Sequence, residues 1–232
     1  MLRALKDLEE EEGLSFDISY SRGPFFLMGD QEQINADKAK YGLPPDADNL
    51  TVTKAKYPND WQTRGQHFDR LIASAGLSPR NKDVTDHRIS AQTMSAHRLA
   101  QYAATESNEK GELVWIALSR RWFMGKDTNI RPIRLDSREL LLECATVAGL
   151  NMDNVHRVLD GEIIDDASII AEVDKVHRAG IHSIPQLIFE VEGLAKGSWL
   201  TDPTATGRVV HGGSGSKETM KAAILQCHHA AA

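Results

Sequence analysis

The sequence predicts an α/β fold in which a block of helices interrupts a smaller mixed α/β part. Near its start, a helical pattern is followed by alternating apolar residues at Phe16, Ile18 and Tyr20, as in a half-buried strand. Residues 61–180 show only helical patterns, and the chain then returns to a proline, two short strands and a helix. We therefore expect a discontinuous domain, residues 1–60 with 181–232, around an inserted helical domain, residues 61–180.

Composition excludes several classes of protein. The 232 residues are 41% hydrophobic and 26% charged, with a net charge of −6, which is typical of a soluble globular protein without general affinity for nucleic acid. No apolar run approaches the roughly 20 residues of a membrane span, and the first residues do not resemble a signal peptide. Cys144 and Cys227 stand in no paired motif, which favours a reducing, cytoplasmic compartment.

The first 60 residues divide into an ordered start and a polar continuation. Residues 2–12 are expected to be helical, because leucines recur at helical spacing and Gly13 suits the position after a helix. A strand is expected over residues 16–20. Residues 29–60 are polar and hold three prolines, so we interpret them as a long irregular loop with one helical turn around residues 34–41.

The central block contains apolar residues at helical spacing in every segment. Helices are expected over residues 61–75, 90–105, 112–124, 136–148, 153–159, and from the caps at 165–166 to Gly180. The helix at Asp136 starts with what resembles a capping box with Glu139, and it places Cys144 on its apolar face. A buried thiol is the interpretation of Cys144, since free cysteines are usually buried.

The last part centres on Ile184-Pro185, which lies between a helix end and an apolar run. Strands are expected over residues 186–191 and 207–211, forming a hairpin with an extended tip, and a helix over 217–227. A proline here is a turn device, and from the residues alone both a trans and a cis bond stay open. A cis bond would turn the backbone of Ile184 outward, free to pair with an extended chain.

The order of these elements resembles the thioredoxin fold of the DsbA type, with an all-helical insertion. Local stretches resemble those of the FrnE and 2-hydroxychromene-2-carboxylate isomerase-like branch of that family. These stretches are Arg88 with TMSAHRLA at 93–100, FMGKD at 123–127, GLN at 149–151, GIHSIP at 180–185 and VHGGSGS at 210–216. The resemblance covers nearly the whole chain.

The chain departs from this family at its first strand. The family begins with a strand that ends in Cys-Pro-x-Cys or, in the isomerase and kappa glutathione-transferase branches, in a catalytic serine. This sequence has no C-x-x-C and starts in what would be the following helix. Losing that central strand would leave several backbone groups unpaired at about 1–3 kcal/mol each, against a total stability of about 5–15 kcal/mol. We therefore expect an N-terminally incomplete version of a longer protein, or a degenerate member that lost its nucleophile.

Smaller departures affect the same regions. Gln92 replaces the asparagine of the family, Ser183 replaces a glycine, and residues 192–206 are expected to form an enlarged hairpin loop.

Two candidate substrate-binding loops follow from the resemblance. The first consists of Ser183, Ile184 and Pro185, whose proline is cis in the family and whose backbone pairs with an extended thiol substrate or glutathione. The second is the turn before the last helix, which receives the γ-glutamyl end in the glutathione-using branch. It consists of Ser214, Gly215 and Ser216. Free N–H groups there suit a carboxylate, and the alternative is a turn in which Ser216 caps the helix.

A third candidate group surrounds the start of one helix. Arg88, Thr93, His97 and Arg98 would line the cleft between the helical and thioredoxin-like parts, and the alternative is packing and helix capping. Residues 227–229, Cys-His-His, offer too few ligands for a structural metal site. No catalytic residue is assigned within the chain, and no metal is expected.

Two functions follow from the resemblance. The first is a DsbA-like thioredoxin-fold oxidoreductase, with thiol–disulfide or glutathione-linked chemistry, whose nucleophile is not present in this chain. The alternative is a catalytically inactive thioredoxin-like module that uses its proline loop to bind an extended peptide or glutathione. No cofactor is certain, and glutathione is the candidate. The expected partner is a thiol or disulfide substrate, without nucleic acid or membrane. Dimers are common among such relatives, so a homodimer stays open.

Overall fold

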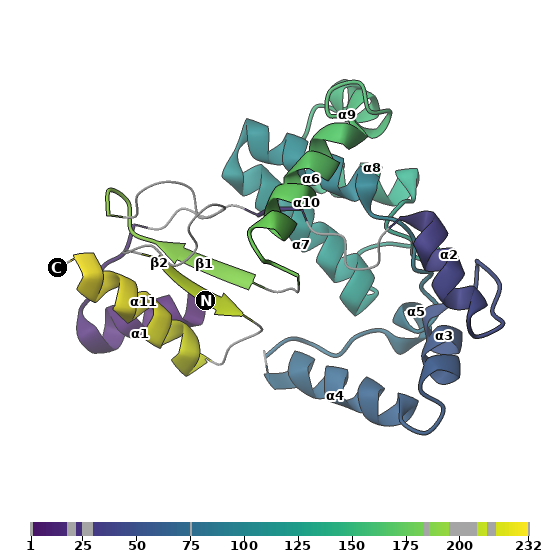
Figure 1. Ribbon diagram of the computed structural model, residues 1–232, viewed down its shortest axis with the longest axis horizontal. Coiled ribbons are helices and arrows are strands. Elements are labelled where there is room, and N and C mark those ends of the chain that lie inside the picture. Colours follow the sequence, from purple (N-terminus) through teal and green to yellow (C-terminus); the bar gives the residue numbers. More distant parts are fainter. Residues whose placement is uncertain are drawn as a thin grey trace. The chain divides into compact units, whose positions relative to one another are not determined.

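The computed structural model describes residues 2–17, 22–24, 30–74, 76–182, 186–194, 208–212 and 217–231 (Figure 1). These ranges form a mixed α/β structure that is mostly helical and contains a two-stranded antiparallel sheet. The chain divides into two compact units, Met1–Leu27 with Ile170–Ala232, and Met28–Ile169. We call them the discontinuous unit and the helical unit.

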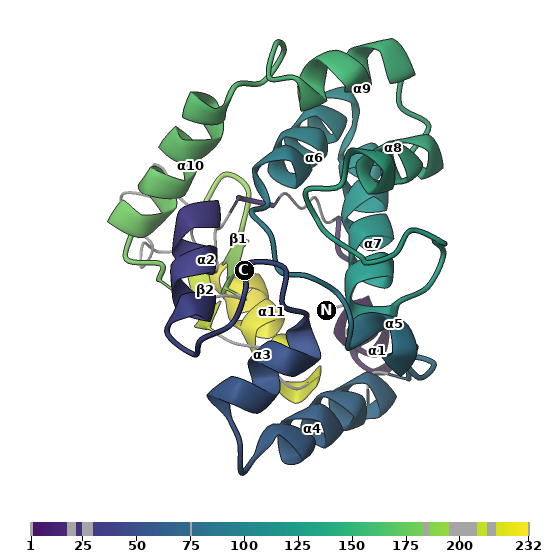
Figure 2. The same cartoon turned by 90° about the vertical axis from the view of Figure 1, so that its right-hand side faces the viewer.

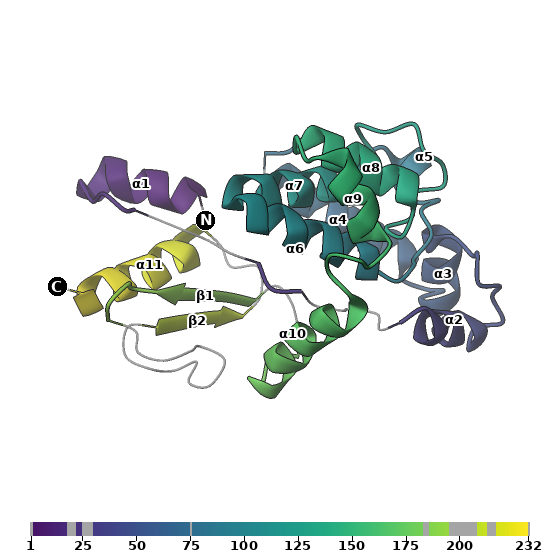
Figure 3. The same ribbon diagram turned by 90° about the horizontal axis from the view of Figure 1, so that it is seen from above.

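The discontinuous unit is built on a β-hairpin. Strands β1 (Gln186–Glu190) and β2 (Arg208–Gly212) pair so that Phe189 lies opposite Val209. Alternate side chains of a strand share a face, so Leu187 and Phe189 point the same way and pack against the cluster of α1 (Leu2–Glu12) and α11 (Lys217–Ala231). Figures 1 and 3 show both helices on the same side of the hairpin.

Charged side chains join the first helix to the last. The Nζ of Lys217 lies 2.5 Å from Oδ2 of Asp7, and the Nζ of Lys221 lies 2.6 Å from Oε2 of Glu11. The hydrogen bond from Lys217 lowers the pKa of Asp7 below its ordinary value. These pairs lie beside the buried cluster that includes Leu8 and Ile224, so α1 and α11 form one layer.

The helical unit has its core between four helices, α6 (Met94–Glu106), α7 (Asn108–Met124), α8 (Arg138–Val147) and α9 (Met152–Leu159), as Figure 2 shows. Leu99, Val114, Leu141 and Val155, one from each helix, are fully buried. Burial of each such side chain contributes about 1.5–3 kcal/mol.

Helices α6 and α7 approach closely because of a glycine. A Cβ added at Gly111 would lie 3.0 Å from Cβ of Ala104, so the two backbones meet at small residues. Ser107 ends α6 and caps α7, and its Oγ accepts a hydrogen bond from the backbone N–H of Lys110 at 3.1 Å.

Most helix predictions are confirmed, and four of these helices are followed by a glycine. Gly13, Gly125, Gly149 and Gly180 follow α1, α7, α8 and α10 (Asp166–Arg178), each with a positive φ that an L side chain rarely adopts. Helix α4 (Trp61–Ser74) and the strand pair also match the expected ranges closely. Residues 13–17 carry no strand, and the rest of the strand expected over residues 16–20 lies outside the described residues.

The long-loop prediction for residues 29–60 is wrong, although the helical turn expected around residues 34–41 coincides largely with a helix observed there. The segment forms α2 (Gln31–Ala39) and α3 (Asn49–Lys56). Asp30 and Asp48 begin them, each accepting a hydrogen bond at 2.8 Å from the backbone N–H three residues later. The two aspartates therefore cap two helices in a segment whose polar composition had predicted a loop. The segment also belongs to the helical unit, whereas the sequence placed residues 1–60 with the discontinuous part.

Two smaller differences concern helix starts. The cap of α8 is Ser137 rather than Asp136, because Oγ of Ser137 accepts from the N–H of Leu140 while Asp136 pairs with Arg134. The short helix α5 (Lys82–Thr85) was not predicted.

Candidate functional site

The two loops assigned by the resemblance lie outside the described residues. They comprise Ser183, Ile184 and Pro185, and Ser214, Gly215 and Ser216. The cis prediction for Ile184-Pro185 therefore stays a prediction. Among the described residues, a cis X–Pro bond occurs at Arg131-Pro132.

Arg88 is held by aromatic rings and a backbone carbonyl. Its Cζ lies 4.7 Å from the ring centroid of Trp122 and 5.9 Å from that of Phe123, and Nη1 donates to the carbonyl of Trp122 at 2.9 Å. Its Nε is buried and has no hydrogen-bond partner in the described part of the chain. Burial lowers the pKa of Arg88 to about 10, and the positive charge of Arg80 acts in the same direction.

Thr93, His97 and Arg98 contact different neighbours. Thr93 occupies the cap position of α6 but makes no side-chain capping hydrogen bond. His97 is 6% exposed, with its ring edge-on to Trp115 at 5.6 Å between centroids. Arg98 donates from Nη2 to the carbonyl of Leu159 at 2.8 Å. These contacts are those of packing and positioning, and the role of this group in lining a cleft stays a prediction.

Both thiols are buried. Cys144 is 0% exposed in the core of the helical unit, as expected, and burial raises its pKa to about 11. Cys227 is 8% exposed, burial raises its pKa, and its Sγ lies 3.8 Å from the carbonyl oxygen of Phe189. Because the thiolate is the reactive form, neither thiol is prepared to act as a nucleophile at neutral pH.

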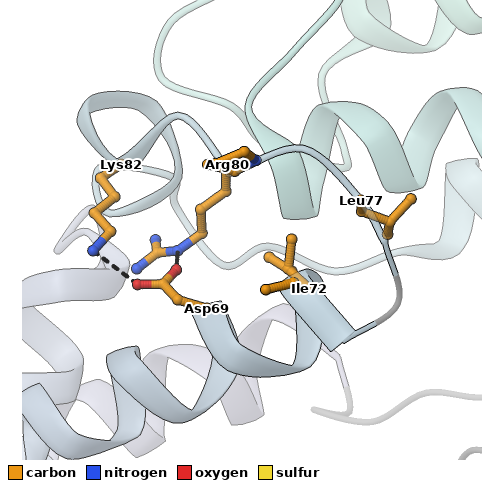
Figure 4. Close-up of a pocket in the computed structure, with 7 residues that line it drawn as sticks. Asp69, Ile72, Leu77, Arg80 and Lys82 are labelled. Carbon is orange, nitrogen blue, oxygen red and sulfur yellow. Dashed lines mark hydrogen bonds and ion pairs between the residues drawn. The ribbon is translucent and has the colours of Figure 1, made fainter.

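Sequence reasoning missed a pocket of about 230 Å³ between α4 and the segment that leads to α5 (Figure 4). We call it the α4 pocket. It is lined by Asp69, Ile72, Ala73, Leu77, Pro79, Arg80 and Lys82. The chain reverses at Gly76, whose φ is +68°, and the segment bearing Leu77 and Arg80 passes over the side of α4 that bears Asp69 and Ile72. The amphipathic pattern of α4 was the available signal, but no spacing rule links it to residues beyond the turn.

Ion pairs form one wall of the α4 pocket. Arg80 is 9% exposed, and its Nε lies 2.7 Å from Oδ1 of Asp69 while its Nη1 lies 2.5 Å from Oδ1 of Asp86. Nη1 also donates to Oγ1 of Thr85 at 2.6 Å. Lys82 places its Nζ 2.8 Å from Oδ2 of Asp69. Both oxygens of Asp69 are thus engaged by fixed cations.

The two partners respond to burial in opposite ways. Burial alone would raise the pKa of Asp69, but hydrogen bonds from Lys82 and Arg80 outweigh it and hold that pKa below the ordinary value. Burial alone would lower the pKa of Arg80, but the carboxylates of Asp86 and Asp69 raise it. Asp69 and Arg80 are therefore both ionised at neutral pH.

Aromatic rings connect this wall to Arg88. The Cζ of Arg80 lies 5.9 Å from the ring of Phe68, and the rings of Phe68 and Phe123 lie 6.1 Å apart. Arg88 stands over Phe123 in turn. The cluster holds three cations, Arg80, Lys82 and Arg88, and two carboxylates, Asp69 and Asp86, so one positive charge is in excess.

Within the described ranges, no group of three or more His, Cys, Asp or Glu residues is arranged to hold a metal ion, and no helix has the length and apolarity of a membrane span. No family model, curated protein or solved structure matches the chain.

Proposed function

We propose that this protein is thioredoxin-like and DsbA-related, and that its discontinuous unit binds an extended thiol or disulfide substrate, a peptide or glutathione. In this proposal the chain contributes substrate binding to thiol chemistry and does not itself act as the thiol catalyst.

The arrangement of the discontinuous unit supports the thioredoxin-like part. Helix α10 leads to Ile184-Pro185, the hairpin follows at once, and α1 and α11 lie together on one side of that hairpin. This is the order expected for the second half of a thioredoxin-like domain that retains the helix before it. In that plan the loop before β1 offers its backbone N–H and C=O to an extended chain, which is the hydrogen bonding of strand addition.

The burial of both thiols favours a binding role over a catalytic one. A thiol with a pKa of about 11, as for Cys144, is ionised in only about one molecule in 10⁴ at pH 7. Cys227 is shifted in the same direction. Thiol exchange on a bound substrate would then use a thiolate from another molecule, such as glutathione or a second protein.

A thiol–disulfide or glutathione-linked oxidoreductase is the second candidate. It is favoured by the order of the family-like stretches from Arg88 to Ser216, and it requires a nucleophile that this sequence does not contain.

Turnover assays separate the two candidates. Insulin reduction and glutathione transfer are measured with the unaltered chain and with a Cys144→Ala/Cys227→Ala variant. The binding role predicts equal, background rates for both proteins. Turnover that disappears in the cysteine-free variant would refute it.

Binding is tested by titrating S-methylglutathione and a short disulfide-linked peptide while amide NMR signals are recorded. We expect shifts at Leu187 and Phe189, and a Kd at least tenfold weaker in Pro185→Ala. Pro24→Ala, in the same unit, is the matched control and should bind within twofold of the unaltered chain. If neither ligand binds the unaltered chain, the proposal fails.

A further inference from the structure

The apolar side of the α4 pocket contains a buried floor and an exposed rim. Ile72 is 7% exposed, whereas Leu77 is 55% exposed, and Ala73 and Pro79 complete the apolar lining. Both residues line the pocket, Ile72 from α4 and Leu77 from the segment that passes above it (Figure 4). A bound alkyl chain would remove the rim leucine from water, which is favourable in proportion to the area covered.

The polar lining holds two cations, Arg80 and Lys82, against one carboxylate, Asp69, and it has spare hydrogen-bond donors. An ammonium has three donors, and among the described residues Lys82 uses one, toward Asp69. The Nη2 of Arg80 has no hydrogen-bond partner there, while its Nε and Nη1 are engaged. Each oxygen of Asp69 already accepts a hydrogen bond from a cation, so a cationic ligand would compete with Lys82 and Arg80 for this carboxylate. The free hydrogen-bonding capacity therefore suits an anion.

The size of the α4 pocket limits the ligand. Its volume of about 230 Å³ lies below the range of about 300–1,000 Å³ that is usual for drug-sized molecules. A short chain with one charged end fits these dimensions and the division of the lining into an apolar and a cationic side.

We propose that the α4 pocket binds a short aliphatic monocarboxylate, with its alkyl chain against Ile72 and Leu77 and its carboxylate hydrogen-bonded to Lys82 and Arg80. The site lies entirely in the helical unit and is independent of the substrate-binding role of the discontinuous unit. It adds a small-molecule ligand to a protein whose other proposed ligands are thiols.

A chain-length series on the full chain tests the proposal. Butanoate, pentanoate, hexanoate and octanoate are titrated by calorimetry, with hexanol and hexylammonium as uncharged and cationic controls. Each added methylene should lower Kd about fourfold, the factor that corresponds to about 0.8 kcal/mol per buried methylene, until the pocket is full. Hexanol should bind more weakly than hexanoate, and hexylammonium should not bind. Equal binding of hexylammonium, or a Kd that does not depend on chain length, would overturn the proposal.

Two variants locate the site. Lys82 and Leu77 are more than half exposed, so their substitution leaves the fold intact. Lys82→Met should raise Kd for hexanoate about three- to tenfold, the range for one partly solvated charged hydrogen bond. Leu77→Ser should reduce the factor by which each added methylene lowers Kd.

Lys175→Met is the matched control, because Lys175 is 46% exposed and paired with Glu172 outside the helical unit. The Lys175→Met variant should bind hexanoate with the same Kd as the unaltered chain. If Lys82→Met and Lys175→Met bind hexanoate equally well, or if amide shifts on titration avoid Ile72, Leu77 and Lys82, the carboxylate binds elsewhere and the proposal is wrong.

Discussion

Replacing Gly125 by alanine should destabilise the helical unit strongly, because the site combines a special backbone with close packing. Gly125 follows α7 with a φ of +62°, and its N–H bonds to the carbonyls of Arg120 and Arg121. A Cβ there would lie 2.9 Å from Cβ of Val84 and 3.1 Å from the carbonyl oxygen of Asn81, so the segment that includes α5 would have to move.

The magnitude follows from three contributions. A left-handed conformation costs an L residue about 1–2 kcal/mol. Overpacking a close site costs about 1–3 kcal/mol. Alanine lowers the entropy of the unfolded chain, which restores about 0.4–1 kcal/mol. The free energy of unfolding should therefore fall by roughly 1–4.6 kcal/mol, with a central value of about 3 kcal/mol.

Gly149→Ala is the matched control for that variant. Gly149 follows α8 with a φ of +63°, and no heavy atom of the described residues would lie within 4 Å of its added Cβ. Only the backbone contribution remains, so a loss of roughly 1 kcal/mol is expected. Urea unfolding followed by circular dichroism measures both variants. Equal losses would show that contact with Val84 and Asn81 contributes nothing, and that the packing argument is mistaken.

Three further predictions concern side chains of the helical unit. In a Cys227→Ala background, Cys144 should react with a disulfide reagent at pH 8 at least a hundredfold more slowly when native than in urea, because its pKa is about 11; rapid native labelling would contradict its burial. Gly161→Ala should cost about 1–2 kcal/mol, both because its φ is +80° and because it displaces Arg98, whose Nη1 would lie 2.6 Å from the new Cβ; the loss should shrink in an Arg98→Met background, and an equal loss there would show that Arg98 contributes nothing. The pKa of Asp69 is lower in the folded state, so its stabilising contribution is complete above the unfolded value of about 3.9 and is lost as pH falls below it. Unfolding free energies at pH 7 and pH 3 should therefore differ less in Asp69→Asn than in the unaltered chain, and an unchanged difference would remove Asp69 from the acid response.

Local rules predicted the helices whose ends carry their own signal. Gly13, Gly125 and Gly149 each supply a positive φ that stops a helix, and apolar spacing placed α4, α7 and α8 between such stops. The same rules failed where a helix start was marked by a single capping side chain. Asp30 and Asp48 start α2 and α3, but prolines and polar composition nearby suggested a loop.

Contacts between distant residues explain why the site was only partly anticipated. Arg88 belongs to a family-like pattern in an irregular segment, yet the rings that it contacts, Trp122 and Phe123, come from α7. The pair Asp69 and Arg80 depends on the reversal of the chain after α4. Neither pairing follows from helical periodicity, because it is decided by tertiary packing.

Helix α10 has a practical consequence for anyone who wants to dissect the chain. The division between the two units falls between Ile169 and Ile170, inside this helix rather than in a loop. Excision of the helical unit at that point would leave Asp166–Ile169 as a single severed turn, which is too short to persist alone, and would bare the fully buried Ile169. A graft or limited-proteolysis fragment should therefore keep α10 whole, as far as Gly180.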